Sequence, residues 1–434
     1  MTVQEAIDYI TSKKAVETAP GLHRIRALMD ALGNPQRQYP CVHVAGTNGK
    51  GSACAMAESI LRAAGYRTGL DTSPHLLRFN ERIQINGVPV SDERLVQATE
   101  QVRRAAEAME EGPNWSEIIT AVTLVAFALE KVDVAVLEVG LGGEFDPTNV
   151  IDTPAAALIM NIGYDHTELL GGTLEAIASA KAGIIKSGGD VIIYRGEPGV
   201  EAVFERKAAG CGARLHKADF DSIRPVSESI DGQVFDACGY KELALPLAGP
   251  HQQRNAAVVI TAMDVLRTAG WHITPENIRR GLANVVWPAR FEVISHDPVF
   301  ILDGGHNPQC LDAADDALRR LLPGKRVVFL VGMLRDKDVE QMVERLRAVS
   351  DQYVTITPIS DRAMEAEDLT ELIRSHGGNA LTGGEIARGI AMSMELAGKD
   401  GVVCCIGSLY LAGAVRSIML GRDSLPSAGD AARE

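Results

Sequence analysis

The sequence predicts an α/β protein with two sheets, the first in a larger domain spanning residues 1–287 and the second in a smaller domain spanning residues 288–434. Three observations support this. Short apolar segments typical of buried strands alternate with helical segments, which favours mostly parallel sheets. A chain of 434 residues is too long for one ordinary core. The alternation also restarts after Val286-Trp-Pro-Ala-Arg290, where we place the boundary.

Composition and charge exclude several classes of protein. The hydrophobic content of 46% and charged content of 23% are typical of globular chains. A net charge of −14 without a basic block argues against nucleic-acid binding. No apolar run approaches the roughly 18 residues of a membrane helix. The acidic segment Met1–Asp8 is unlike a signal peptide, and the seven cysteines are scattered, so we expect a cytoplasmic protein.

The first strand predicted in the larger domain is followed by a glycine-rich turn and a helix. Cys41–Val44 is predicted as a buried strand, Gly46–Ser52 as the turn, and Ala53–Arg62 as the helix. This layout is P-loop-type, because glycine amides and a helix N-terminus can converge on phosphate and Lys50 adds a full charge. The turn departs from the usual P-loop in two ways: two residues rather than four separate Gly46 from Gly49, and Gly51 stands where a hydroxyl residue is expected. A turn that merely joins strand to helix is the alternative.

Three further strands are expected to end in polar side chains that are well placed to contact a ligand, and the buried Glu138 could bind a metal. Ser73 follows a strand at residues 67–71, Glu138 ends a strand at 132–139, and His166 follows a strand at 155–160. Ligands bind at the carboxyl ends of strands in open α/β sheets. A buried carboxylate such as Glu138 is costly unless it is paired or holds a cation. The alternatives are a solvated strand end for Glu138 and a structural role for His166.

The remaining elements continue the alternation. In the first domain we expect helices at 3–32, 91–110, 116–129, 173–182, 198–209 and 251–269, a strand at 190–194, and β character in 210–249. The second domain is predicted to be Rossmann-like, with strands at 299–302, 326–331, 353–357 and 402–406 and helices at 309–321, 337–348, 365–375, 384–397 and 408–420. The tail 425–434 is polar and is predicted to be disordered.

Ten short motifs, in order along the chain, resemble the folylpolyglutamate synthase and dihydrofolate synthase family, a branch of the Mur-type ATP-dependent amide ligases. They are Gly46-Thr-Asn-Gly-Lys-Gly-Ser52, Ser73-Pro-His-Leu76, Phe79-Asn-Glu-Arg-Ile83, Leu137-Glu-Val-Gly-Leu-Gly-Gly143, Asp165-His-Thr-Glu168, Lys181-Ala-Gly-Ile184, His251-Gln-Gln-Arg-Asn255, Trp287-Pro-Ala-Arg-Phe291, Asp303-Gly-Gly-His-Asn-Pro308 and Gly407-Ser-Leu-Tyr-Leu411. The unusual spacing of the glycine-rich turn is that family's own variant.

The resemblance implies a reaction. ATP would phosphorylate a substrate carboxylate to an acyl phosphate, and the amino group of L-glutamate would attack it to give an amide, ADP and phosphate. The implied acceptors are dihydropteroate and the glutamate tail of (tetrahydro)folate, and the implied oligomeric state is a monomer. Because triphosphate and carboxylate are both anions, cations and N–H donors are needed where they meet.

The resemblance also implies roles for individual residues. The implied nucleotide site comprises Gly46, Thr47, Asn48, Gly49, Lys50, Gly51, Ser52, Asn255, Arg290 and Asp303. Two Mg²⁺ ions are implied, the first held by Ser73 and Glu138 and the second by His166. Lys181 matches a lysine that is carbamylated in the family and could bridge the metals, and His306 matches a histidine near the phosphates. Lys50, His166, Lys181 and His306 are therefore the candidate catalytic residues.

Two departures from the family pattern concern the acceptor. Glu144 replaces a residue that is usually basic, and Ser116 lies in Trp115-Ser-Glu117, where an aromatic residue normally precedes the glutamate. They leave open a second hypothesis, a Mur-type amide ligase for a different carboxylic acid. A third hypothesis, a nucleotide-binding regulatory protein without catalysis, is disfavoured because a pure binder has little use for two metal ions.

Overall fold

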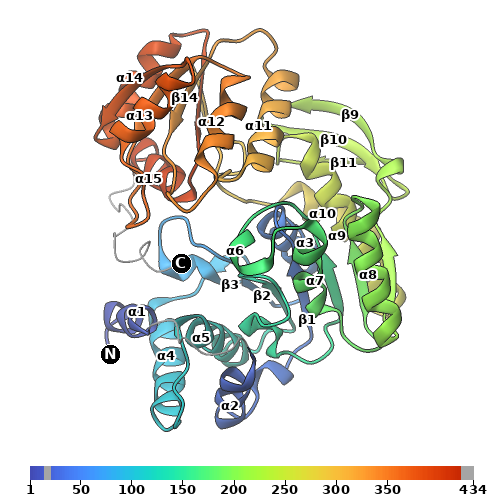
Figure 1. Cartoon of the computed structure of the whole chain (residues 1–434). Helices are drawn as coiled ribbons and strands as arrows, with labels where there is room; N and C mark the ends of the chain where they lie inside the picture. The colour runs from blue at the N-terminus through green and yellow to red at the C-terminus, as the bar shows by residue number, and fades with distance from the viewer. Residues whose placement is uncertain (14–20, 422–434) are drawn as a thin grey trace.

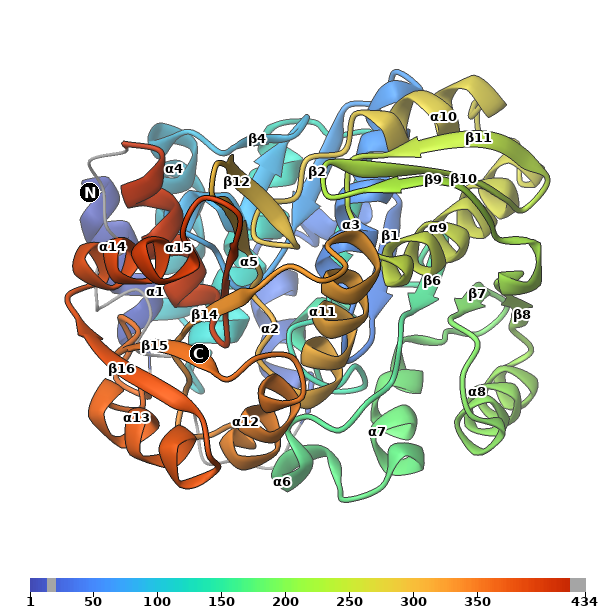
Figure 2. The same ribbon diagram turned by 90° about the horizontal axis from the view of Figure 1, so that it is seen from above.

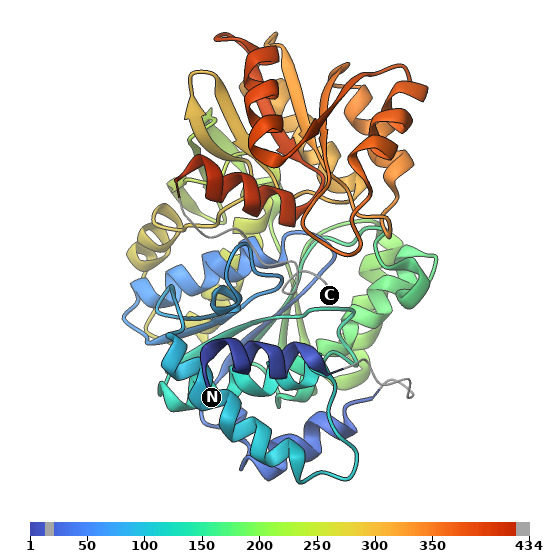
Figure 3. The ribbon, with the colours of Figure 1, turned by 90° about the vertical axis from the view of Figure 1, so that its left-hand side faces the viewer.

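The computed structural model describes residues 1–13 and 21–421, and it divides into parts built around separate sheets. Figures 1 and 3 show the C-terminal part, coloured orange and red, stacked on the part coloured blue to green. Within the described residues there is no helix that is both long and apolar enough to cross a membrane. The tail 425–434, predicted to be disordered, lies outside the described residues.

The larger sheet has eight strands, six of them parallel, with an antiparallel hairpin at one edge. Its spatial order is β4 (Val88–Pro89), β3 (Ile83–Ile85), β2 (Thr68–Asp71), β5 (Val134–Glu138), β1 (Cys41–Ala45), β6 (Ala156–Ile159), β7 (Asp190–Ile193) and β8 (Arg214–Lys217). The central strands are buried on both faces, which explains why they are apolar at every position rather than at alternate ones.

Helices cover both faces of this sheet. One face packs on α3 (Lys50–Ala63), α9 (Pro250–Thr268) and α10 (Pro275–Ala283). The other packs on α1 (Val3–Ser12), α2 (His23–Ala31), α4 (Asp92–Glu107), α5 (Trp115–Leu129), α7 (Leu174–Lys181) and α8 (Pro198–Cys211). In β1, Val42 and Val44 join the first core while Cys41 joins the second, as the alternation of a strand requires. The short α6 (Thr167–Leu170) follows His166.

A small antiparallel sheet extends the first part. It consists of β9 (Arg224–Ser229), β10 (Gly232–Ala237) and β11 (Tyr240–Leu245), in the order β11-β10-β9. Figure 2 shows the three strands side by side next to α9 and α10. The β character predicted for residues 210–249 is thereby confirmed.

The C-terminal sheet has six strands, of which only the edge strand β12 is antiparallel. Its order is β12 (Glu292–His296), β13 (Val299–Leu302), β17 (Val402–Ile406), β14 (Val327–Val331), β15 (Gln352–Ile356) and β16 (Asn379–Gly384). The helices α11 (Pro308–Leu321), α12 (Val339–Arg347) and α13 (Ala366–Ser375) pack on one face, and α14 (Ile386–Ala397) and α15 (Leu409–Met419) pack on the other.

The predicted elements are largely confirmed, but the structure differs from the prediction at several places. The helical periodicity of residues 3–32 belongs to two helices, α1 and α2, and residues 14–20 between them lie outside the described ranges. The edge strands β12 and β16 were not predicted, because edge strands carry polar residues and lack the apolar run of a central strand. The helix predicted from residue 384 therefore begins at Ile386, after β16.

The described residues also contain the short 3₁₀ turns η1 (Pro35–Arg37), η2 (Phe79–Arg82), η3 (Pro147–Val150), η4 (Ala182–Ile184) and η5 (Phe220–Ser222).

Candidate active site

The strands that precede the predicted site residues are neighbours in the larger sheet. β1 pairs in parallel with both β5 and β6, and β2 pairs in parallel with β5. Val44 lies opposite Glu138, and Asp71 lies opposite Leu137. The segments that follow these strands therefore leave the sheet at one edge, where parallel α/β sheets place their ligands.

The glycine-rich turn positions the N-terminus of α3 at this edge. Gly49 is the N-cap residue, with a φ of +85° that favours glycine, and no side chain caps the helix. The backbone N–H groups of Thr47 and Asn48 donate to the carbonyl of Asn161, at 2.8 and 3.3 Å. The backbone N–H groups available to a phosphate are thus those of residues 49–52, in the first turn of α3. These groups have no hydrogen-bond acceptor within the helix.

The structure explains why Gly51 replaces the usual hydroxyl residue. A Cβ at this position would lie 2.8 Å from the ring of Trp287, so a larger side chain requires Trp287 to move. Asn255 of α9 lies over the same turn, 2.7 Å from where a Cβ of Gly49 would be. The hydroxyl of Ser52 is buried and accepts a hydrogen bond from Gln252 at 3.3 Å.

Lys50, Glu138 and Ser73 come together beside the turn. The Lys50 ammonium donates to the carbonyl of Thr47 at 3.2 Å and lies 4.0 Å from the Glu138 carboxylate. Glu138 is only 5% exposed and accepts the backbone N–H of Ser73 at 3.3 Å. Burial raises the pKa of Glu138, and Lys50 opposes this. A buried carboxylate that is only partly compensated is suited to a cation.

Lys181, at the end of α7, contacts the start of the same turn. Its side chain is buried, and its Nζ donates to the carbonyl of Gly46 at 2.9 Å. Burial lowers the pKa of Lys181 to about 7, and the charge of Lys50 contributes. A neutral amine is a nucleophile, so this environment suits the carbamylation that the family resemblance implies.

His166 stands at the N-terminus of α6 in the left-handed conformation, with a φ of +50° that is uncommon for a residue with a Cβ. Partial burial lowers its pKa, Asp165 opposes this, and Lys337, Lys50 and Lys181 lower it further. The imidazole is thereby held neutral, which is the form that binds metal.

Asp165 joins the two parts of the molecule at this point. Its carboxylate accepts from Lys337 at 2.8 Å and lies 4.0 Å from His306. The side chains of Asp165 and Lys337 are 12% and 9% exposed. Burial by itself would raise the pKa of Asp165, but the Lys337 ammonium outweighs it and holds this pKa well below its usual range.

Arg290 and Asp303 belong to the C-terminal part of the molecule. Arg290 precedes β12, and Asp303 directly follows β13. Asp303 accepts the backbone N–H groups of Phe291 and Gly305, at 2.9 and 2.7 Å. Burial raises the pKa of Asp303, and Arg290 opposes this. The charge of Arg290 also lowers the pKa of Glu138, against the larger effect of burial.

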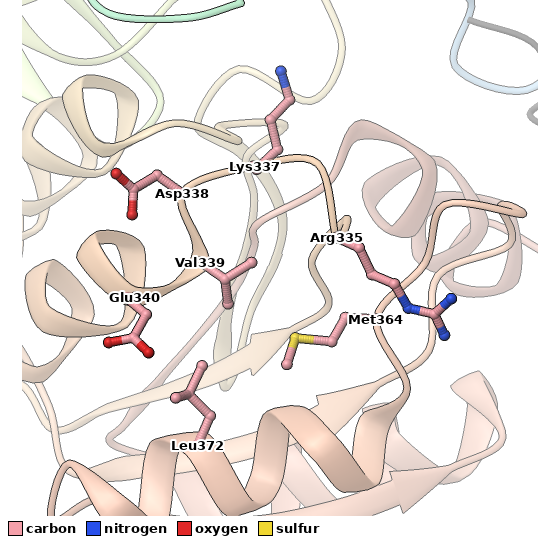
Figure 4. A pocket seen from close by; sticks show the side chains of 7 residues that line it. All are labelled: Arg335, Lys337, Asp338, Val339, Glu340, Met364 and Leu372. Carbon is pink, nitrogen blue, oxygen red and sulfur yellow. The ribbon is translucent and has the colours of Figure 1, made fainter. Parts of the chain in front are cut away.

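Lys337 and Gln309 lie outside the motifs quoted in the sequence analysis, whereas Asp165 and Asn307 stand in two of those motifs without an assigned role; all four form hydrogen bonds in this region. Lys337 lies in the polar loop after β14, so the strand-end criterion applied to Glu138 could have found it. The pocket in Figure 4, of about 430 Å³, lies on the other side of this loop and is lined by Arg335, Lys337, Asp338, Val339, Glu340, Met364 and Leu372. Figure 4 shows the Lys337 side chain pointing away from the apolar members of the lining.

No cluster of three or more His, Cys, Asp and Glu side chains that could hold a metal occurs in the described part of the chain. A magnesium site here would draw on other oxygen donors. Mg²⁺ binds through one or two carboxylates and retains waters and substrate phosphates, so Glu138 with the Ser73 hydroxyl fits it.

Comparisons with known proteins agree with this geometry. The family model of the Mur ligase middle domain matches residues 44–263, and that of the glutamate ligase domain of Mur ligases matches residues 289–409. The chain thus has the middle and glutamate ligase domains of a Mur-type ATP-dependent ligase.

Individual relatives narrow the class further. A folylpolyglutamate synthase of Lacticaseibacillus casei is 39% identical over 98% of this chain and 100% of its own length. A dihydrofolate synthase/folylpolyglutamate synthase of Bacillus subtilis is 34% identical over 95% of this chain and 98% of its own. A folylpolyglutamate synthase of Mycobacterium tuberculosis, complexed with ADP and AMPPCP, superposes with a TM-score of 0.87 at 30% identity, covering 97% of this chain and 99% of its own. The chain belongs to the folylpolyglutamate synthase and dihydrofolate synthase family.

Proposed function

We propose that this protein adds L-glutamate to dihydropteroate, to the glutamate tail of (tetrahydro)folate, or to both, by way of an acyl phosphate, with ADP and phosphate as products. The observation that carries the proposal is the convergence of Lys50, Glu138 and Lys181 at the glycine-rich turn. Three ionisable groups, each at least partly withdrawn from water, are arranged where two anionic substrates must meet.

The residues have separate tasks in this proposal. The first-turn amides of α3 and Lys50 bind the phosphates of ATP, and Asn255 covers the turn. Glu138 and Ser73 hold one Mg²⁺, and His166 with carbamylated Lys181 holds a second. Bound magnesium would neutralise charge on the phosphates. Gly46, Thr47, Gly49, Gly51 and Ser52 shape the turn, while Arg290, Asp303 and His306 complete the nucleotide site from the C-terminal part.

We further propose two domains, residues 1–287 and 288–434, with ATP bound between them, and a cytoplasmic monomer. All seven cysteines are free thiols, which agrees with a reducing compartment. Light scattering of the purified protein tests the monomer.

An activity assay tests the reaction. Purified protein with Mg²⁺, ATP and L-glutamate is expected to release ADP when dihydropteroate or tetrahydrofolate is added, and not when the acceptor is omitted. No ADP release with either acceptor would refute the proposed substrates.

A different carboxylic acid as the acceptor remains the second candidate, favoured by Glu144. This acidic residue is exposed, and its backbone N–H donates to the carbonyl of Ala180 at 2.9 Å, so it is anchored next to Lys181. An acceptor screen distinguishes the candidates, because a protein of this second kind releases ADP with another acid and with neither pteridine compound.

A further inference from the structure

Three segments that are far apart in the sequence meet beside the glycine-rich turn. They are residues 46–49 of the turn itself, residues 161–165 after β6, and residues 307–310 at the start of α11. Hydrogen bonds link each segment to the other two. We call this contact the three-segment joint.

The side chain of Asn48 lies at its centre. The Asn48 Nδ2 donates to Oε1 of Gln309 at 2.6 Å. Its Oδ1 accepts from Nδ2 of Asn307 at 3.0 Å and from the Cys310 thiol at 3.2 Å. The amide is therefore held by the C-terminal part of the molecule, although it belongs to the turn of the larger sheet.

The side chain of Asn307 both caps α11 and binds the other two segments of the joint. Its Oδ1 caps α11 by accepting the backbone N–H of Cys310 at 3.0 Å. Its Nδ2, besides binding Asn48, lies 3.3 Å from the Asp165 carboxylate. The side chain is 3% exposed, so neither hydrogen bond is readily exchanged for one with water.

Gln309 connects the segment after β6. Its Oε1 lies 2.3 Å from where a Cβ of Gly163 would be, so the glycine permits the close approach. The Asn161 carbonyl in the same segment accepts the backbone N–H groups of Thr47 and Asn48. The turn is thus fixed through its backbone by one segment and through its side chain by another.

We propose that Asn48 and Asn307 are positioning residues that couple the conformation of the phosphate-binding turn to the seating of the C-terminal part. Phosphate binding that orders the turn would favour docking of residues 307–310. Docking would in turn place Asp303 and His306, which precede that segment in the chain, at the nucleotide. This rests on the proposed function, because the turn must bind nucleotide for the coupling to matter.

A double-mutant cycle tests the coupling. Asn307→Ser retains an oxygen that can cap α11 but loses the reach to Asn48, and Asn48→Ala removes the partner. Each single variant is expected to lower kcat about tenfold while changing the Kd of AMPPCP less than about threefold, because the first-turn amides and Lys50 remain. The kcat of the double variant is expected to be no lower than that of the more impaired single variant. Asn379→Ser, at an exposed site in β16, is the matched control and keeps full activity.

Hydrogen exchange gives a readout that does not depend on the acceptor. In the wild type, AMPPCP with Mg²⁺ is expected to slow exchange of the backbone amides in residues 306–311, and Asn48→Ala is expected to abolish this slowing. The coupling would be overturned if the loss of kcat in the double variant equalled the product of the two single losses. It would also be overturned if AMPPCP slowed exchange equally in the wild type and in Asn48→Ala. Wild-type protein that does not bind AMPPCP would refute the proposed function and the coupling together, whereas binding without slowed exchange would refute the coupling alone.

Discussion

Burial of Lys181 makes a quantitative prediction about stability and pH. The pKa of this lysine is lowered from 10.5 to about 7 in the folded protein. A pKa difference of roughly 3.5 corresponds to a free-energy cost of about 5 kcal/mol for the protonated folded form. Between these two pKa values the unfolded chain binds more protons than the folded chain, so the free energy of unfolding rises with pH.

Lys181→Met removes the titrating group and retains much of the apolar volume. Raising the pH from 7 to 9 is expected to stabilise the wild type by about 2 kcal/mol relative to the variant. The measurement is guanidinium chloride unfolding, followed by circular dichroism, in buffer free of CO₂ so that the amine stays unmodified. Lys325→Met, at an exposed position, is the control and is expected to show no such trend. A stability difference between wild type and Lys181→Met that is the same at both pH values would refute the buried, neutral amine.

Three further predictions concern the site and its supports. Lys50→Ala is expected to lower turnover more than about a hundredfold with an unchanged circular dichroism spectrum, because the loop amides cannot replace its charge; retained turnover removes Lys50 from the cradle. Glu138→Gln is expected to raise the Mg²⁺ concentration needed for half-maximal activity at least about tenfold, and an unaltered magnesium titration contradicts its role as a ligand. Gly183→Ala is expected to cost about 3 kcal/mol of stability, because its Cβ would lie 2.3 Å from the Cα of Glu144. Thermal unfolding measures this against Gly112→Ala, which adds a Cβ in open space; equal melting temperatures would show that the backbone there yields.

Local chemistry made the central part of the fold predictable. Strands buried on both faces must be apolar throughout, so β1, β5 and β14 stand out as short apolar runs. The strand-end criterion singled out Ser73, Glu138 and His166 as candidates, and the strands that precede them are parallel neighbours in one sheet. Edge strands such as β16 lack this signal, since half of their backbone faces solvent or loops and places few demands on side chains.

The sequence by itself determined the alternation of strands and helices, the glycine-rich turn with Lys50, and the order of motifs that places the chain in its family. Only the tertiary structure decided the partners of those residues. The lowered pKa of Lys181 arises mainly from burial, and the pairing of Asp165 with Lys337 joins loops that follow strands of different sheets. The requirement for glycine at position 51 comes from the ring of Trp287. Burial, charge coupling and close packing depend on distances in space, which a one-dimensional pattern does not contain.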